Sequence, residues 1–256
     1  MHKSSYLNMS RFITEYLDPS QTLRIVDLGS QAIAEHDSYK SLCASPKWTY
    51  IGCDIVDGNN VDVVLTNAYN WKELAAASVD VVISGQAFEH IEFPWVTMSE
   101  ISRVLKDGGL CCIIAPSNGV YHGYPVDCWR YYEDGMRALA KYVDMEVLEV
   151  QTQRSSLDFA DYDKVWQDTV LICRKPEQRS LAGKFSAHAR QSMNRYLVKS
   201  ITWEAGQTAL RRKYKLKYLQ YKLLLLCPFV FGRLRIKFTD KKNKYKALLK
   251  SVRLTE

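Results

Sequence analysis

The sequence predicts an α/β protein in which one mainly parallel sheet is followed by a basic helical extension. Over residues 20–175, short runs rich in β-branched and aromatic side chains alternate with longer stretches of helical period, the pattern of strands joined by helices. The charge then changes sign. Residues 1–178 carry 15 Lys and Arg against 25 Asp and Glu, whereas residues 179–256 carry 20 against 3. We therefore expect a sheet domain over residues 1–178 and a basic, mainly helical appendage over residues 179–256.

Seven runs have the character of strands and three stretches have that of helices. The last two strands have no strongly helical stretch between them, which allows them to pair antiparallel. The expected strands are LRIVDL from Leu23, TYIGCD from Thr49, VDVVL from Val61, VDVVIS from Val79, LCCIIA from Leu110, MEVLEVQ from Met145 and TVLICR from Thr169. The expected helices run from Tyr6 to Leu17, from Trp95 to Leu105 and from Glu133 to Val143.

The composition indicates a globular protein of a reducing compartment. Of the 256 residues, 47% are hydrophobic and 25% charged, which is outside the disordered range. The seven cysteines form no CxxC pair and lie mostly in apolar runs, so we expect neither a disulfide framework nor a metal site. The N-terminus lacks an apolar signal core, and the longest apolar run, Leu223–Gly232, is shorter than the roughly 20 residues that span a bilayer. These features predict a cytoplasmic protein.

Small or polar residues follow the expected strands, where an open parallel sheet binds its ligands. The first strand ends at Asp27 and Gly29, and the second ends at Asp54, 25 residues after that glycine. This separation is close to the roughly 20 residues at which an acid accepts hydrogen bonds from a ribose diol. Each residue alone is an ordinary turn residue, but their ordered succession predicts a nucleoside site.

The motifs IVDLGS, YIGCDIVDG, VDVVISGQAFEHI and EISRVLKDGGLCCIIAPS resemble, in order and spacing, those of class I S-adenosylmethionine-dependent methyltransferases. The likeness covers about residues 20–118, and VDVVISGQAFEHI with LKDGG is its most specific part. It implies a Rossmann-like, doubly wound sheet of seven strands with the last strand antiparallel. It also implies that the chain is an enzyme whose cofactor is S-adenosyl-L-methionine and whose product is S-adenosyl-L-homocysteine.

The resemblance assigns roles at the first two strand ends. Gly29 would let the backbone approach the methionine part of the cofactor, and Asp27 would serve its amino group directly or through water. Asp54 would hold the ribose hydroxyls, and Ile55 would flank the adenine. The segment from Ser30 to Ala32 is where the family often has a further glycine, so we expect any alteration of the cofactor site there.

The resemblance extends to the third and fourth strand ends. Asn67 falls where the family often has an aspartate near the adenine amino group, and Ala68 would supply backbone there. An amide can still accept through its oxygen, so this departure weakens the likeness little. Ser84 and Gln86, after the fourth strand, would line the methionine end.

A nicotinamide enzyme on the same fold is the competing interpretation. Such an enzyme needs a G-x-G-x-x-G turn, in which glycines allow a pyrophosphate to sit at a helix N-terminus. The sequence contains no such run. S-adenosylmethionine has no phosphates and tolerates fewer glycines, so the methyltransferase interpretation is favoured.

The stretch Ser117–Leu139, which follows the fifth strand, is polar and strongly aromatic. Aromatic rings stack on sugar faces, an acid binds hydroxyls and an arginine binds phosphate, so this loop is typical of a polyhydroxyl or phosphorylated acceptor. The alternative is a loop whose rings cover the sheet edge while an acid and an arginine pair at i,i+3. The predicted acceptor residues are Tyr121, Tyr124, Asp127, Trp129 and Arg130.

This loop and EHIEFPW, from Glu89, together look like a bacterial subgroup of these methyltransferases associated with surface-glycan biosynthesis. The resemblance implies a sugar-linked acceptor. A hydroxyl acceptor must lose a proton as it attacks, and histidine is the natural base near neutral pH. The candidates are His122, with Asp127 as helper or alternative base, and His90, which could instead cap a helix or hold the loop.

The basic appendage contains an amphipathic stretch from Gly206 to Cys227. It could pack on the sheet domain or on a second subunit, giving a homodimer, or dock on an anionic membrane surface from the cytoplasmic side. Nucleic-acid binding is less well supported, because a basic patch alone is a weak signal. The sequence thus predicts an O-methyltransferase acting on a sugar or phosphate-bearing intermediate of a surface glycan. The alternatives are methylation of RNA or a small amine, or a catalytically silent scaffold.

Overall fold

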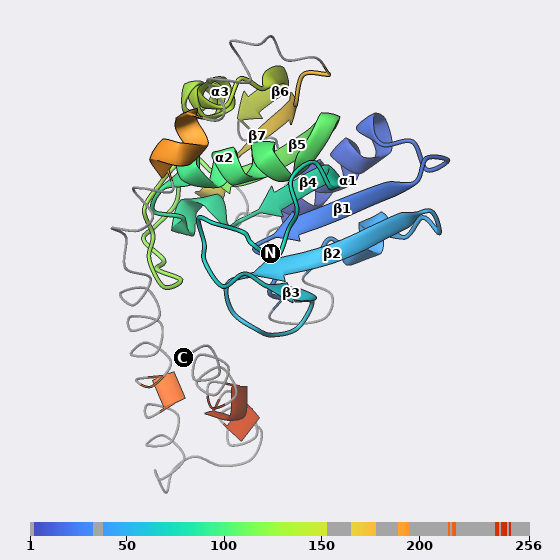
Figure 1. Ribbon diagram of the computed structural model, residues 1–256. Helices are drawn as coiled ribbons and strands as arrows, with labels where there is room; N and C mark the ends of the chain where they lie inside the picture. The colour runs from blue at the N-terminus through green and yellow to red at the C-terminus, as the bar shows by residue number, and fades with distance from the viewer. Residues whose placement is uncertain are drawn as a thin grey trace, which may run out of the picture.

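A single seven-stranded sheet organises the described part of the chain (Figure 1). The computed structural model describes residues 3–32, 38–152, 165–177 and 189–194, together with isolated positions between 215 and 246. The strand order is β3-β2-β1-β4-β5-β7-β6. In chain order the elements are α1 (Lys3–Tyr16), β1 (Leu23–Leu28), η1 (Lys40–Cys43), β2 (Trp48–Asp54), β3 (Val63–Val64), β4 (Val79–Gly85), η2 (Phe88–His90), α2 (Pro94–Val104), β5 (Leu105–Pro116), α3 (Glu133–Tyr142), β6 (Glu146–Thr152) and β7 (Asp168–Arg174).

Strand direction confirms the predicted fold class. The pairs β1·β2, β1·β4, β2·β3 and β4·β5 are parallel, whereas β7 runs antiparallel to both β5 and β6. All seven predicted strands and all three predicted helices are present within a few residues of their expected bounds. The largest difference is β5, which begins at Leu105 rather than Leu110 because the strand continues through Gly108 at a φ of +79°. Glycine adopts this left-handed conformation without the steric cost of a Cβ.

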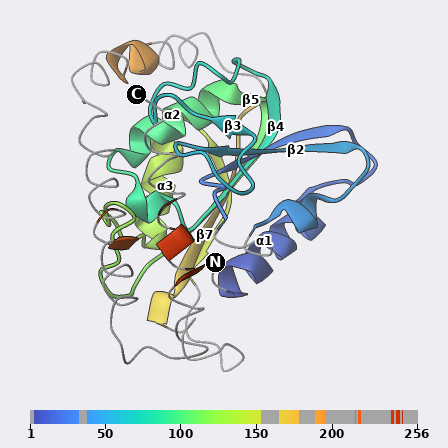
Figure 2. The ribbon, with the colours of Figure 1, turned by 90° about the horizontal axis from the view of Figure 1, so that it is seen from below.

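Helices cover both faces of the sheet, as Figure 2 shows with α1 on one side and α2 and α3 on the other. Successive residues of a strand point to opposite faces, so β1 sends Ile25 toward α1 and Val26 toward α2. On the α1 side, Met9 and Phe12 are fully buried. The core of the other side includes Met98 of α2, which is also fully buried. The sheet is therefore apolar on both faces, as doubly wound folds require.

The carboxyl ends of β1, β2, β4 and β5 meet at one edge of the sheet, since these strands run in the same direction. The start of β7 joins that edge, because Asp168 pairs with Pro116 in the antiparallel ladder. The strand ends and loops at this edge carry all the side chains predicted from the sequence to bind cofactor or acceptor. Ligand sites in open α/β sheets occupy this edge.

Residues 189–194 are helical and pack on α2 and α3. The amide of Asn194, which is almost fully buried, donates to Ser99 Oγ at 2.8 Å and accepts from Tyr142 Oη at 3.3 Å. Arg190 forms an ion pair with Asp144. Two residues of the predicted appendage, Arg190 and Asn194, thus contact the sheet domain. The predicted amphipathic stretch 206–227 lies almost entirely outside the described residues.

Among the described residues, no helix combines the length and the apolar character needed to cross a bilayer.

Candidate functional site

Gly29, directly after β1, lies very close to the turn that follows β4. Its φ is +79°, its N–H donates to the Cys53 carbonyl at 2.9 Å, and a Cβ added to it would lie 2.5 Å from the Cβ of Ala87. A side chain at this position would be both strained and obstructed. The lone glycine of the first turn is therefore required by the structure, and it keeps the backbone of that turn bare.

Asp54 is held by the backbone of two neighbouring turns. Its Oδ2 accepts from the N–H of Gln31 at 3.0 Å, and its Oδ1 accepts from Ile55 at 2.7 Å and Val56 at 3.2 Å. Burial raises the pKa of this carboxyl, while the three amides oppose that shift. An ionised carboxylate offers about four acceptor sites, so capacity for a further hydroxyl donor remains.

Asp27 is almost fully buried at the end of β1. The phenol of Tyr50 donates to its Oδ2 at 2.5 Å, and Asn60 in turn donates to Tyr50 at 2.8 Å. Burial raises the pKa of Asp27 to about 7, the nearby charge of Asp54 adds to the rise, and the bond from Tyr50 opposes it. This acid can therefore be neutral or charged near physiological pH, depending on what lies beside it.

Ser30 and Ser84 make structural hydrogen bonds. Ser30 Oγ donates to the Asn60 carbonyl at 2.9 Å, and Asn60 Nδ2 returns a bond to the Ser30 carbonyl at 3.0 Å. Ser84 is fully buried, and its hydroxyl donates to the Leu28 carbonyl at 2.9 Å. These bonds fix the strand ends, and a direct contact of either hydroxyl with the cofactor stays a prediction.

Gln86 follows β4 in a left-handed conformation, with a φ of 60°. Its Nε2 donates to Asp168 Oδ1 at 2.9 Å, and its Oε1 is buried and accepts no hydrogen bond from the described residues. A buried acceptor without a donor is costly, so this oxygen fits an N–H group of a ligand. Strain in a non-glycine residue at such a position is typical of functional sites.

Asn67 and Ala68 form a turn after β3. Asn67 Oδ1 accepts from the N–H of Tyr69 at 2.8 Å, and the Ala68 carbonyl accepts from Trp71 Nε1 at 2.9 Å. Both residues are partly exposed, as is Ile55 after β2. Their predicted contacts with adenine are untested.

Glu89, in η2, is a buried acid that sequence reasoning did not single out. Its carbonyl accepts from the N–H groups of Cys128 at 2.7 Å and Trp129 at 3.2 Å, which ties the acceptor loop to η2. Its side chain is 1% exposed, and neither carboxylate oxygen accepts a hydrogen bond from the described residues. Burial raises the pKa of Glu89 to about 8.

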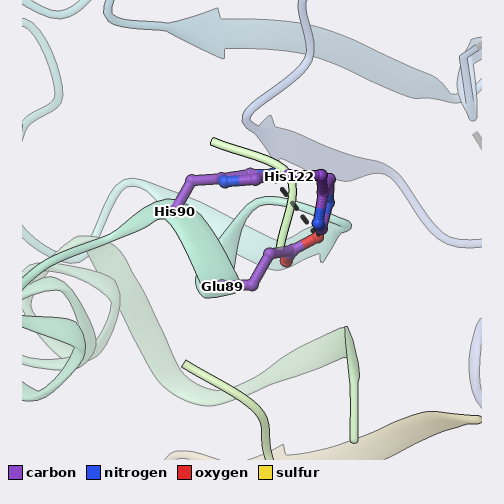
Figure 3. A group of neighbouring side chains, drawn as sticks. All are labelled: Glu89, His90 and His122. Carbon is purple, nitrogen blue, oxygen red and sulfur yellow. Dashed lines mark ion pairs between the residues drawn. The ribbon is translucent and has the colours of Figure 1, made fainter. Parts of the chain in front are cut away.

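The two predicted histidines lie beside this acid, as Figure 3 shows. Glu89 Oε1 is 3.6 Å from His90 Nε2 and 3.9 Å from His122 Nε2. The two imidazole rings meet edge to face, with centroids 4.9 Å apart. His90 Nδ1 lies 2.6 Å from the Val126 carbonyl, so His90 also holds the loop, as the alternative interpretation expected.

Asp127 and Arg130 pair with each other, which is the i,i+3 bridge of the alternative interpretation. Arg130 NH1 donates to Asp127 Oδ1 at 2.5 Å and NH2 donates to Oδ2 at 2.9 Å. The same carboxylate accepts from the N–H of His122 at 2.7 Å. These bonds lower the pKa of Asp127 to about 2, with the bond from Arg130 as the largest cause. Asp127 is therefore ionised, which makes it a weak base but a good orienting partner for His122.

The predicted acceptor rings are exposed at the same edge. Tyr121 is 77% exposed, while Tyr124 and Trp129 are 37% and 38% exposed. The buried Trp166 packs beneath this loop, with its ring centroid 4.6 Å from that of His122. Trp166 precedes β7 and is 44 positions from His122 in the sequence, so no local motif could have paired them.

Comparisons with known proteins show what the sheet domain is similar to. Residues 28–113 match the family model described as a methyltransferase domain. This match extends from the end of β1 into β5 and contains every predicted cofactor residue except Asp27. No curated protein matches the sequence.

Solved structures share the fold at low sequence identity. A 1,6-didemethyltoxoflavin-N1-methyltransferase of Burkholderia thailandensis, solved with S-adenosylhomocysteine, has a TM-score of 0.52 at 11% identity over 68% of this chain and 79% of its own. The carbon methyltransferase CurJ has a TM-score of 0.51 at 14% identity, over 68% of this chain and 55% of its own. The cyclase SpnF scores 0.50 at 13% identity, over 67% of this chain and 81% of its own. The chain thus spans little more than half of CurJ, and at these identities the fold alone is shared.

Residues 28–113 are therefore similar to a methyltransferase domain, and S-adenosylmethionine is the cofactor that this similarity implies. The residues at the strand ends fit this group. The bare backbone at Gly29 suits its methionine part, the ordered carboxylate of Asp54 suits its ribose hydroxyls, and the buried acceptor oxygen of Gln86 suits its amino nitrogen. The reaction differs among proteins of this fold, so the acceptor must be argued from the residues around Glu89.

Proposed function

We propose that this S-adenosylmethionine-dependent methyltransferase methylates an oxygen of a sugar or phosphate-bearing intermediate of a surface glycan. When bound, the cofactor supplies a methyl group on a positively charged sulfur, which leaves as a neutral thioether. The observation that carries the proposal is the grouping of Glu89, His90 and His122 under a loop of exposed aromatic rings, beside the cofactor turns.

The grouping supports a hydroxyl as the acceptor. A hydroxyl needs its proton removed as it attacks, and an imidazole close to a carboxylate is a common device for this task. Asp127 orients His122 through its backbone, while Glu89 lies at Nε2 of both imidazoles. A nitrogen or carbon acceptor makes different demands, so the proton-accepting groups favour O-methylation.

The exposed rings support a sugar. Trp129 keeps its ring in place through a hydrogen bond from Nε1 to the Ile91 carbonyl at 2.9 Å and an edge-to-face contact with Trp95. A ring fixed in this way and open to solvent loses little entropy when a sugar face stacks on it. Arg130 already donates hydrogen bonds to Asp127, so a phosphate on the acceptor would have to share Arg130 with that carboxylate.

Mass spectrometry tests the proposal. Candidate lipid-linked and nucleotide-linked sugars are incubated with the enzyme and S-adenosylmethionine, and each is examined for a product heavier by one methylene. We expect such a product from at least one glycan intermediate, with fragmentation placing the methyl group on oxygen. Transfer to RNA or to a small amine, with none to any glycan intermediate, would overturn the proposal.

A further inference from the structure

Three potential metal ligands come together from two segments distant in the sequence. Glu89 and His90 belong to η2, whereas His122 lies in the loop after β5. One ligand atom from each, a carboxylate oxygen and two imidazole nitrogens, lie within 4.8 Å of one another (Figure 3). Zinc bonds of about 2.0–2.1 Å at tetrahedral angles place neighbouring ligand atoms about 3.3 Å apart. The observed distances of 3.6 and 3.9 Å to Glu89 Oε1 therefore approach those of a zinc site within small side-chain movements.

The groups behind both imidazoles are those that orient metal-binding histidines. His90 Nδ1 lies 2.6 Å from the Val126 carbonyl, so this nitrogen carries the proton and Nε2 carries the lone pair. His122 Nδ1 lies 3.4 Å from Asp127 Oδ2 and 3.5 Å from NH2 of Arg130, which is also bound to that carboxylate. Arg130 can only donate, so Nε2 of His122 carries the lone pair when Nδ1 donates to Asp127 rather than accepting from Arg130. A carbonyl or carboxylate behind the second ring nitrogen fixes the tautomer and makes the first nitrogen a better ligand. Both Nε2 atoms are directed toward the same acid.

The surroundings of Glu89 also suit a bound cation. Glu89 is almost completely shielded from solvent, and its two carboxylate oxygens accept no hydrogen bond within the described part of the chain. A buried carboxylate without a direct hydrogen bond is costly, and proteins offset the cost by protonation, by ion pairs such as those that the two imidazoles can form, or by a bound metal. His122 is 35% exposed, so an ion can reach the group from solvent.

We propose that Glu89, His90 and His122 bind one zinc ion through Oε1, Nε2 and Nε2. Two imidazoles and one carboxylate form a ligand set that zinc uses in catalytic sites, where a fourth position stays available for an oxygen ligand. Magnesium and calcium favour sites made of oxygen atoms and are poor candidates for this set.

A zinc ion at this site would activate the acceptor of the proposed methyl transfer, a consequence that rests on the proposed function. An oxygen bound to zinc loses its proton at a lower pH than the free hydroxyl, so the imidazoles would act as ligands rather than as bases. Zinc binding itself does not depend on the proposed function and is measured without cofactor or acceptor.

Calorimetry on the untagged full-length protein tests the site directly. The protein is treated with a chelator, dialysed and titrated with zinc, and with cobalt(II) as a spectroscopic probe. We expect one ion per chain and a cobalt absorption typical of low coordination with nitrogen ligands. Failure to bind zinc or cobalt would overturn the proposal.

Matched variants separate this site from adventitious binding. Glu89→Gln and His122→Gln keep the side-chain size and should each weaken zinc binding at least 100-fold, and Asp127→Asn should weaken it about 10- to 100-fold by releasing His122. Cys128→Ser is the control, because this exposed thiol is a common zinc ligand that lies outside the proposed set. Circular dichroism verifies that each variant folds. Unchanged affinity in both Glu89→Gln and His122→Gln, or loss of binding in Cys128→Ser alone, would contradict the site.

The two proposals fail separately. Zinc bound at one ion per chain with no methylated glycan product would leave the metal site standing and overturn the proposed function. Methyl transfer that continues unchanged in the chelator-treated protein would support the function and contradict a catalytic role for zinc.

Discussion

At the scale of single residues, the conformation of Gly29 makes it the most sensitive position of the cofactor site. Gly29→Ala should lower the free energy of unfolding by about 2 kcal/mol or more, because the new Cβ meets Ala87 at 2.5 Å and a left-handed residue costs about 1–2 kcal/mol. Urea denaturation measures the change.

The same pair of residues supplies an internal control. Ala87→Gly removes the other Cβ, so the double variant should recover the part of the loss that comes from the collision, with a coupling of about 1 kcal/mol or more. Additive effects of the two substitutions would show that the close approach of the turns after β1 and β4 does not restrict Gly29.

Asp27 should make the stability of the fold depend on pH. Its pKa is raised to about 7, so the folded protein binds a proton more tightly than the unfolded chain, in which the pKa is near 3.8. Stability from this group is therefore present below about pH 4 and is lost as the pH rises toward 7. Asp27→Asn, which cannot ionise, should be more stable than the parent at pH 8 by about 2 kcal/mol and similar to it at pH 4.5.

Urea denaturation at the two pH values checks this difference, with Asp57→Asn as the control on an exposed acid. The control should show no gain at pH 8. A destabilised Asp27→Asn at pH 8 would mean that the buried carboxylate is stabilised by partners stronger than Tyr50. Because Asp27 is also predicted to serve the cofactor amino group, the stable variant should bind S-adenosylmethionine more weakly.

At the scale of elements, helix α1 is fastened to the functional edge through one buried hydrogen bond. Ser4 Oγ donates to Asp168 Oδ2 at 2.8 Å, and Asp168 Oδ1 accepts from Gln86. Ser4→Ala should lower the free energy of unfolding by about 1.5–3 kcal/mol, because it removes a hydrogen bond from a fully buried carboxyl group.

Thermal unfolding of Ser4→Ala beside Ser10→Ala measures this contribution, since Ser10 lies on the same helix and is only partly buried. We expect the change in Ser10→Ala to stay within about 0.5 kcal/mol. Equal effects of the two substitutions would indicate that helix propensity, rather than the bond to Asp168, sets the stability of α1.

The elements themselves could be predicted from the sequence because their signals are local. The alternation of β-rich and helical stretches predicts all seven strands. The lack of a strongly helical stretch between the last two strands predicts that these two can pair antiparallel. The site was predicted less completely. Glu89 resembles an ordinary loop acid until burial is known, and its approach to His122 depends on two loops from different strand ends. Contacts of this kind follow from tertiary packing, which no spacing of residues encodes.

At the scale of the whole molecule, the opposite charges of the two segments predict how the protein meets a membrane. Residues 179–256 carry 20 basic against 3 acidic residues, so we expect the full chain to float with vesicles that contain anionic phospholipid at low salt. High salt should release it, because the screening length falls from about 30 Å at 0.01 M to about 3 Å at 1 M. Neutral vesicles serve as the control, and the absence of flotation at low salt would exclude membrane docking.

The central claim is that the turns at the sheet edge bind the cofactor while the histidines beside Glu89 act on the acceptor. The most direct measurement compares turnover and S-adenosylmethionine affinity in His122→Ala and His90→Ala, with the exposed Tyr132→Phe as the control. We predict that both histidine variants lose at least 100-fold in turnover and change by less than about twofold in affinity, which separates activation of the acceptor from cofactor binding. Full turnover in both variants, or a parallel loss of affinity, would contradict the account.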